Sequence, residues 1–174
     1  MLQLATGESA ALKNPTQFSR LFDEYHGLIF RTAYRLTGSA ADAEDVLQTI
    51  FLRLVRRDAE ATPRREESYF RRAAVNASLD LIRARKADRN LPLHENALAG
   101  EPTENRELQD CLRSAFASLT PRSAEIFVLR HIEDLSNAQI AEMLGISQVL
   151  VAVTLHRARR QLQKEIRPCL GGRS

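Results

Sequence analysis

The chain has 174 residues, 44% of them hydrophobic, and a formal net charge of +3. Its length suits one domain or two small ones, and no apolar run approaches the ~20 residues of a membrane-spanning helix. Residues 1–14 lack the basic start and apolar block of a secretion signal, so we expect a cytoplasmic protein without direct membrane insertion.

The first expected helix spans residues 17–37, after a flexible N-terminal tail of residues 1–15. Thr16 stands where an N-cap would, and Gly38 follows the end of the segment. Apolar side chains recur at helical spacing and form one stripe: Phe18, Leu21, Phe22, Tyr25, Leu28, Ile29 and Leu36.

The second expected helix starts at Ser39, which has capping-box spacing to Asp42. Its apolar residues again repeat at the helical period, so it should pack against the first helix as an antiparallel pair. They are Val46, Leu47, Ile50, Phe51, Leu54 and Val55.

The third expected helix follows a polar stretch from residue 56 to residue 67 that contains Pro63. Its apolar face consists of residues spaced by four, three and four, namely Phe70, Ala74, Ala77 and Leu81. The opposite face carries groups that contact phosphates and base edges, namely Arg72, Asn76, Arg83 and Lys86.

Helical periodicity then disappears over residues 88–105, where Pro92, Gly100 and Pro102 occur. This composition describes a flexible linker. Because strand-type alternation is absent from the chain, the fold class should be all-α, with two small helical domains on either side of this linker.

The second domain is expected over residues 106–168. Leu108, Leu112 and Phe116 mark its first helix, and Thr120 followed by Pro121 marks the cap and first position of the next. Ser136 and Gln139 then have capping-box spacing.

A helix-turn-helix follows from the residues after Ser136. Gly145 supplies the left-handed backbone of the turn, and Ser147 can cap the second helix. That helix would turn Val151, Leu155, Ala158 and Leu162 toward the core. A major groove could accept its outer face, although an ordinary helical hairpin is an alternative. The outer residues are Gln148, Val149, Ala152, Val153, His156, Arg157 and Arg160.

Positive charge is concentrated in two blocks. Residues 53–89 carry 11 Lys and Arg against 6 Asp and Glu, and residues 145–174 carry 6 against 1. Phosphate backbones attract such surfaces through counterion release, although chance clustering on solvated helices could produce either block alone.

The residue types that support catalysis or metal binding are scattered. Cys111 and Cys169 have no neighbour at metal-ligand spacing, so we expect them to be buried or incidental rather than a disulfide or a zinc site. The four histidines stand singly, and no Gly-rich phosphate loop is present. We expect no metal, no cofactor, no small-molecule substrate and no enzymatic activity.

Three blocks of sequence resemble the bacterial RNA polymerase sigma factors of the extracytoplasmic-function (ECF) class, small two-domain members of the housekeeping sigma family. The resemblance covers nearly everything from Phe18 to Ile166. The blocks are residues 42–54, Asn76 with residues 80–83, and residues 119–159. The resemblance implies that residues 16–87 are sigma region 2, residues 106–168 are sigma region 4, and residues 169–174 are a C-terminal tail.

The resemblance implies a protein that binds core RNA polymerase, directs it to promoter DNA and helps to melt that DNA. A stand-alone helix-turn-helix repressor or activator is the alternative. The implied polymerase-binding residues are Asp42, Asp45, Gln48, Thr49 and Leu52. The implied minus-ten element contacts are Arg64, Arg65, Arg71, Arg72, Asn76, Arg83 and Lys86.

Two departures from the family affect the DNA contacts. Members of the family commonly carry tryptophan near the start of the third helix, whereas this chain has none, which leaves Tyr69 or Phe70 as the aromatic surface. The recognition helix has Ala152, Val153 and Thr154 where members of the family usually carry Lys or Arg. We therefore expect Val149, Ala152 and Val153 to contact thymine methyls. An anti-sigma factor could instead cover this face. The implied minus-thirty-five contacts are Ser147, Gln148, Val149, Ala152, Val153, His156, Arg157 and Arg160.

Overall fold

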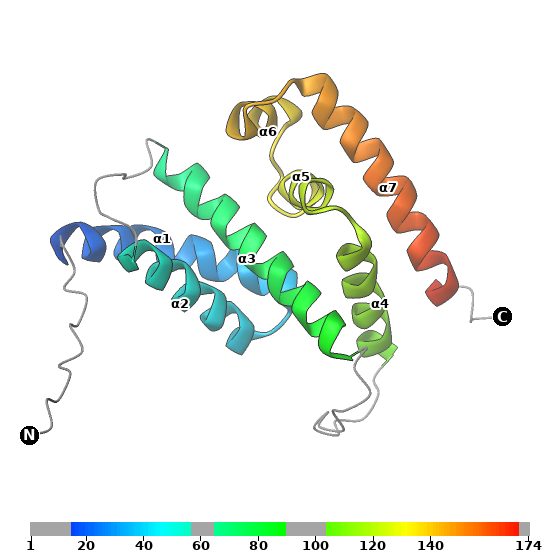
Figure 1. The fold of residues 1–174 in the computed structure, drawn as a ribbon, viewed down its shortest axis with the longest axis horizontal. Helices are drawn as coiled ribbons and strands as arrows, with labels where there is room; N and C mark the ends of the chain where they lie inside the picture. Colours follow the sequence, from blue (N-terminus) through cyan, green and yellow to red (C-terminus); the bar gives the residue numbers. More distant parts are fainter. Residues whose placement is uncertain (1–14, 57–64, 90–103, 171–174) are drawn as a thin grey trace, which may run out of the picture.

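The computed structural model describes residues 15–56, 65–89 and 104–170, which form seven helices and no strand (Figure 1). The helices are α1 (Pro15–Thr37), α2 (Ala40–Arg56), α3 (Glu66–Arg89), α4 (Glu104–Ser118), α5 (Pro121–His131), α6 (Asn137–Leu144) and α7 (Gln148–Leu170). The all-α fold class expected from the sequence is confirmed over these residues.

Helices α1 to α3 form the N-terminal unit around an aromatic core. Phe70 of α3 stacks against Tyr25 of α1 at 4.7 Å and against Phe51 of α2 at 5.8 Å between ring centroids. Phe70, Ala74 and Ala77 are buried in this core and Leu81 packs against it, so the apolar face expected for the third helix is confirmed. The expected cap at Thr16 is wrong, since α1 already begins at Pro15 and Thr16 lies within its first turn.

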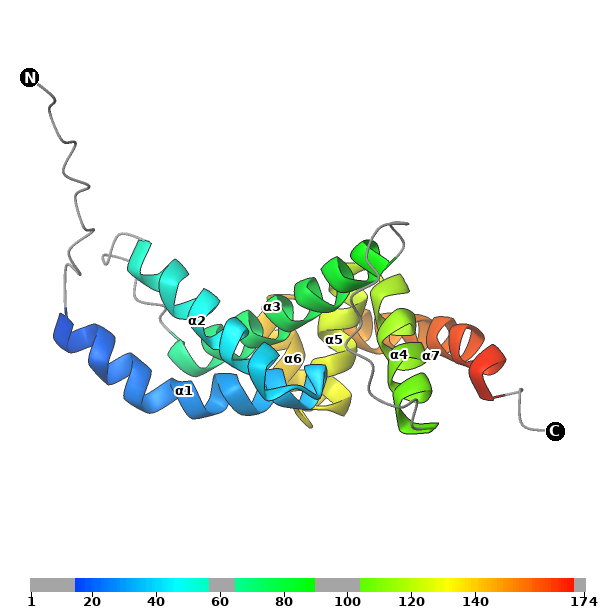
Figure 2. The ribbon, with the colours of Figure 1, turned by 90° about the horizontal axis from the view of Figure 1, so that it is seen from below.

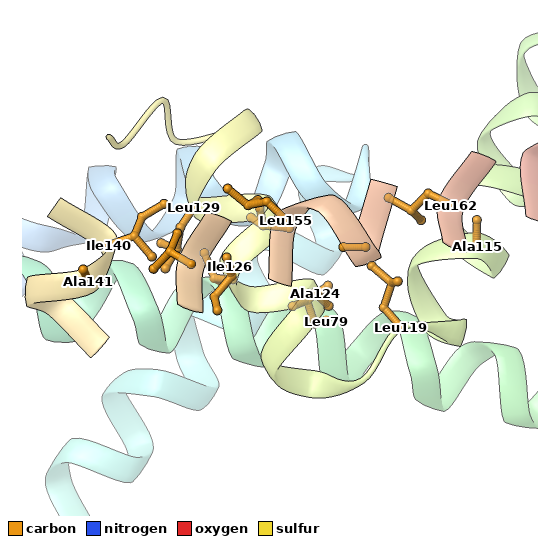
Figure 3. Packing of buried hydrophobic residues seen from close by; sticks show 14 residues of the cluster. Leu79, Ala115, Leu119, Ala124, Ile126, Leu129, Ile140, Ala141, Leu155 and Leu162 are labelled. Atoms are coloured by element: carbon orange, nitrogen blue, oxygen red, sulfur yellow. The ribbon is translucent and has the colours of Figure 1, made fainter. Parts of the chain in front are cut away.

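Helices α4 to α7 form the C-terminal unit. Figure 3 shows its core, which contains Leu119 from the turn after α4, Ile126 and Leu129 of α5, Ile140 of α6 and Leu155 of α7. All five side chains are buried. The core positions expected on the second helix of the helix-turn-helix are confirmed, since Val151, Leu155, Ala158 and Leu162 all belong to this cluster.

Helix α3 belongs to both units. In Figures 1 and 2 it lies between the α1–α2 pair and helices α4 and α5. Val75 and Leu79, on the side of α3 away from Phe70, are buried in the same cluster as Ala124 and Val128 of α5. The two units are therefore packed together through α3.

The ends of these helices refine the expected boundaries. Helix α3 continues to Arg89 and α4 begins at Glu104, so residues 90–103 of the expected linker lie outside the described residues, as does the tail before Pro15. Helix α7 continues to Leu170, past the expected start of the C-terminal tail. Within the described ranges no single helix is long and apolar enough to cross a membrane; α6 and α7 meet that criterion only as a pair bent by 108°.

Candidate nucleic-acid interface

The helix-turn-helix consists of α6, a short turn and α7. Ser136 accepts from the backbone N–H of Gln139, whose side chain accepts from the backbone N–H of Ser136 at 2.8 Å, which completes the expected capping box. Gly145 has a φ of 64° and ends α6 in the left-handed conformation. Ser147 caps α7, because its hydroxyl accepts from the N–H of Leu150 at 3.1 Å.

The outer face of α7 is open along the first half of the helix. Val149 is 72% exposed and Val153 is 40% exposed, which is unusual for large apolar side chains. The other residues expected on this face are exposed as well, namely Ser147, Gln148, Ala152, His156, Arg157 and Arg160. The structure therefore brings all eight candidate minus-thirty-five contacts to one accessible surface.

Three candidate minus-ten residues of α3 donate to carboxylates of the C-terminal unit. Arg72 donates from Nε to Oε1 of Glu125 at 2.8 Å, and Asn76 donates to the same oxygen at 3.1 Å. Arg71 donates to Glu133, which follows α5. None of these acceptors was anticipated from the sequence.

The remaining candidate minus-ten residues have varied surroundings. Arg65 forms an exposed ion pair with Glu142 of α6 at 2.7 Å. Lys86 donates to the carbonyl oxygen of Ser114, and Arg83 contacts Asp80 one turn earlier on its own helix. Arg64 lies outside the described residues.

The two candidate aromatic residues occupy different environments. Phe70 is in the core, as described above, so it cannot provide a surface for a base without unfolding the N-terminal unit. Tyr69 is partly exposed and contacts Phe70 edge to face at 5.2 Å between centroids. Of the two, Tyr69 is the one with an accessible ring.

One edge of α2 is open to solvent. Asp45, Gln48 and Leu52 are all exposed, Leu52 by 53%, and Thr49 beside them is partly buried. Asp42 differs from these four because its carboxylate is 4% exposed and is paired with Arg85 of α3. Its backbone N–H donates to Ser39 at 3.3 Å, so only this half of the expected capping box is present.

Two groups with shifted pKa values lie beside these surfaces. The Arg20 guanidinium donates to Glu66 in the first turn of α3 and lowers the pKa of that carboxyl. Burial lowers the pKa of His131, and the nearby charges of Arg159 and Arg130 lower it further. Because a guanidinium can only donate, Nε2 of His131 accepts from Arg159 of α7 at 3.3 Å.

The cysteines correct the sequence expectation. Cys111 of α4 and Cys169 of α7 form a disulfide, with their Cα atoms 6.5 Å apart. Spacing could not reveal this pair, because 58 positions separate the residues and only the packing of α4 against α7 brings them together. Over the described residues, no three His, Cys, Asp or Glu side chains cluster as a metal site would require.

Comparison with known proteins identifies both units. Residues 21–88 match the family Sigma-70 region 2, and residues 109–162 match Sigma-70, region 4. The chain is 34% identical over 152 residues to the RNA polymerase sigma-E factor of Streptomyces avermitilis, a match that covers 83% of this chain and 84% of that protein. It is 27% identical over 166 residues to the ECF RNA polymerase sigma factor SigW of Bacillus subtilis, covering 86% of this chain and 89% of SigW.

The fold has a counterpart among solved structures. CnrH in complex with the cytosolic domain of CnrY superposes with a TM-score of 0.50 at 24% identity, covering 95% of this chain and 94% of that one. Two helical units that match regions 2 and 4 in that order define a transcription initiation factor of the sigma-70 type. The chain belongs to the ECF class of RNA polymerase sigma factors, which direct the polymerase to promoters.

Proposed function

We propose that this chain binds core RNA polymerase in the cytoplasm, brings it to a set of promoters and helps to separate their strands, without catalysing a reaction itself. The proposal is supported by one observation above all: matches to regions 2 and 4 occur in order on one chain. A stand-alone repressor or activator, the alternative drawn from the sequence, would need neither the open edge of α2 nor the cationic side of α3.

The polymerase surface in this proposal is the open edge of α2. Asp45, Gln48 and Leu52 are spaced by three and four, so they form one continuous strip with a charge, an amide and an apolar group. Thr49 adds to the strip from the side. Asp42 has a positioning role in this proposal, because its pair with Arg85 holds the first turn of α2, next to the strip, against α3.

Run-off transcription with purified core polymerase on a promoter library tests this assignment. The Asp45→Ala, Gln48→Ala double variant should lose promoter-specific transcripts while retaining its helical content. A Glu24→Ala, Gln163→Ala variant removes one acid and one amide from exposed positions elsewhere, and it should transcribe like wild type. Equal transcription by both variants would refute the surface, and duplex binding without any transcripts would favour the repressor or activator.

The proposed minus-ten surface is the cationic side of α3. Arg65, Arg71, Arg72 and Asn76 lie in the first half of that helix or just before it, and Arg83 and Lys86 lie toward its end. A track of guanidinium and amide groups next to an accessible ring suits a single strand, whose phosphates and base faces are both available. Tyr69 supplies the ring in this proposal. Arg64 lies outside the described residues and is assigned to this track from the sequence alone.

The proposed minus-thirty-five surface is the outer face of α7. Its polar contacts would come from Gln148 and Arg157, with Ser147, His156 and Arg160 at the margins. Its centre is apolar. Val149, Ala152 and Val153 have no hydrogen-bonding atoms in their side chains, so they can distinguish bases only by shape and by the thymine methyl group.

Replacing single thymines by deoxyuridine in the minus-thirty-five element isolates this readout, because only a methyl group is removed. One buried methyl corresponds to ~0.8 kcal/mol, so affinity should fall roughly fourfold at each contacted thymine. The Val153→Ala variant should abolish the difference at one position and leave the others unchanged. If guanine substitutions dominated and deoxyuridine had no effect, the apolar readout would be wrong.

An anti-sigma factor is the further partner that we propose. The cluster of exposed apolar side chains at the start of α7, which includes Leu150 together with Val149 and Val153, resembles a protein interface more than a solvated helix. The solved relative CnrH is itself in complex with the cytosolic domain of CnrY. Substituting Val149→Ser should weaken binding of the purified inhibitor and of promoter DNA together.

A further inference from the structure

Two glutamates of the C-terminal unit occupy the cationic side of α3. Glu125 of α5 has a side chain only 5% exposed, and it accepts from Arg72 and Asn76 with one oxygen and from Arg122 of its own helix with the other. Glu133 has a side chain 1% exposed; it pairs with Arg71 and accepts from Thr32 of α1 at 3.0 Å. We call these contacts of Glu125 and Glu133 the interdomain latch.

The chemistry of the latch resembles that of a bound nucleic acid. A carboxylate presents anionic oxygens to a guanidinium in the same way as a phosphate does, and both make charge-assisted hydrogen bonds with it. Burying a carboxylate is unfavourable unless cationic donors compensate. The donors to Glu133 belong to the N-terminal unit, and so do two of the three donors to Glu125. The two buried carboxylates therefore keep these partners only while the two units are in contact.

Apolar packing accompanies the latch. Val75 and Leu79 occupy the same side of α3 as Arg72 and Asn76, and both are buried against the C-terminal core. Burial of these side chains favours closure, while the ion pairs fix which residues of α3 and α5 meet. The interface therefore has an apolar centre and specific charged contacts.

The latch covers one of the three proposed surfaces and leaves two open. Arg71, Arg72 and Asn76 are engaged, whereas the α2 edge around Gln48 and the outer face of α7 around Val153 are exposed. Core polymerase and the minus-thirty-five element can therefore bind the closed protein. The minus-ten strand cannot, because its phosphates and the two glutamates require the same donors, Arg71, Arg72 and Asn76.

We propose that the closed arrangement is autoinhibited: Glu125 and Glu133 act as an internal substitute for promoter DNA and keep the minus-ten surface occupied until the units separate. This inference rests on the proposed function of α3 in binding the minus-ten strand. It adds that the free protein suppresses this binding through named residues outside the DNA-contacting set.

The test uses the full-length Glu125→Gln, Glu133→Gln variant, which keeps the shape of both side chains and removes their charge. Small-angle scattering should show a larger radius of gyration than wild type. Affinity for a single-stranded minus-ten oligonucleotide should rise by about tenfold or more, as expected when the competent state goes from a minor to a major fraction. Affinity for a minus-thirty-five duplex should show only the small gain that the loss of two negative charges produces.

A matched control separates the latch from net charge. The Glu24→Gln, Glu165→Gln variant makes the same change in charge at exposed positions of α1 and α7, and should bind both DNAs like wild type, apart from a small uniform gain. If the glutamine double variant denatures, Glu142→Arg provides a second route. It places a cation opposite Arg65 on the surface, where unfolding is not expected, and should also enlarge the protein.

The outcomes distinguish this inference from the proposed function. A variant that stays compact, or that opens without binding the minus-ten strand more tightly, overturns autoinhibition. The role of α3 is tested separately with polymerase holoenzyme, in which Asn76→Ala should impair promoter opening. If that variant opened promoters normally, the minus-ten assignment would fail, whatever scattering showed about the latch.

Discussion

Arg85 of α3 holds the buried carboxylate of Asp42 with both of its terminal nitrogens. The pair joins the end of the third helix to the first turn of the second, next to the strip proposed to bind polymerase. Asp42 therefore has a structural partner that the sequence did not reveal, and the pair can be tested by its effect on stability.

Replacing Arg85 with alanine should destabilise the N-terminal unit. Asp42, whose side chain is 4% exposed in the intact pair, would lose its cationic partner, which should lower the free energy of unfolding by about 1–3 kcal/mol, less than for a fully buried pair because Arg85 is half exposed. Urea denaturation followed by circular dichroism measures the difference. Arg53→Ala, an exposed change on α2, is the control, and equal midpoints for the two variants would contradict the prediction.

The stability of the turn in the helix-turn-helix should depend on the left-handed backbone of Gly145 and not on the space around this residue. A Cβ at this position would meet no atom within 4 Å, yet the φ of 64° is unfavourable for alanine. Gly145→Ala should therefore lower stability by about 1 kcal/mol, and Gly145→Asn by less, since asparagine tolerates the left-handed region. Equal losses for the two variants in thermal melts would contradict the assignment of this cost to φ.

Reduction of the disulfide should loosen the C-terminal unit. The bond closes a loop between residues 58 positions apart, for which chain entropy gives a stabilisation of up to ~4 kcal/mol. The melting temperature of wild-type protein should fall when reductant is added, and that of the Cys111→Ser, Cys169→Ser variant should not change. An unchanged wild-type melt, with thiol titration confirming full reduction, would contradict this expectation.

His131 should make stability fall as the solution becomes mildly acidic. Its folded pKa lies below the ordinary value of 6.5, so the unfolded chain binds the proton more readily. The free energy of unfolding should therefore decrease as the pH drops below about 6.5, toward the lower pKa of the folded state. His131→Gln keeps an acceptor for Arg159 and should flatten the profile between about pH 7.5 and 5; a profile identical to wild type would exclude His131 as the cause.

Local signals in the sequence predicted much of the fold. The spacing of Val151, Leu155 and Ala158 identified the buried side of α7, and Ser136 with Gln139 identified the start of α6. Both depend on residues a few positions apart, whose geometry the helical repeat determines. The same repeat explains why Asp45, Gln48 and Leu52, spaced by three and four, lie on one exposed edge of α2.

Contacts between distant residues could not be predicted in the same way. Val75 and Leu79 form a second apolar stripe on α3, and their spacing of four was a signal for a second packing surface. The partner of Arg72 could not be predicted from the sequence, because a guanidinium binds a phosphate and a carboxylate equally well. The burial of Asp42 and the pairing of Cys111 with Cys169 likewise depend on how helices pack, which no local pattern specifies.

The contact between Arg72 and Glu125 also bears on how promoters compete with one another. If only the separated units can hold a minus-ten strand, the apparent affinity for every promoter is reduced by the same factor, the fraction of open protein. Substitutions at Glu125 would then raise or lower transcription from all target promoters in proportion and preserve their ranking. Substitutions on the outer face of α7, such as Val153→Ala, would instead change the ranking itself. The overall level of transcription and the preference among promoters would thus be set by different residues of this protein.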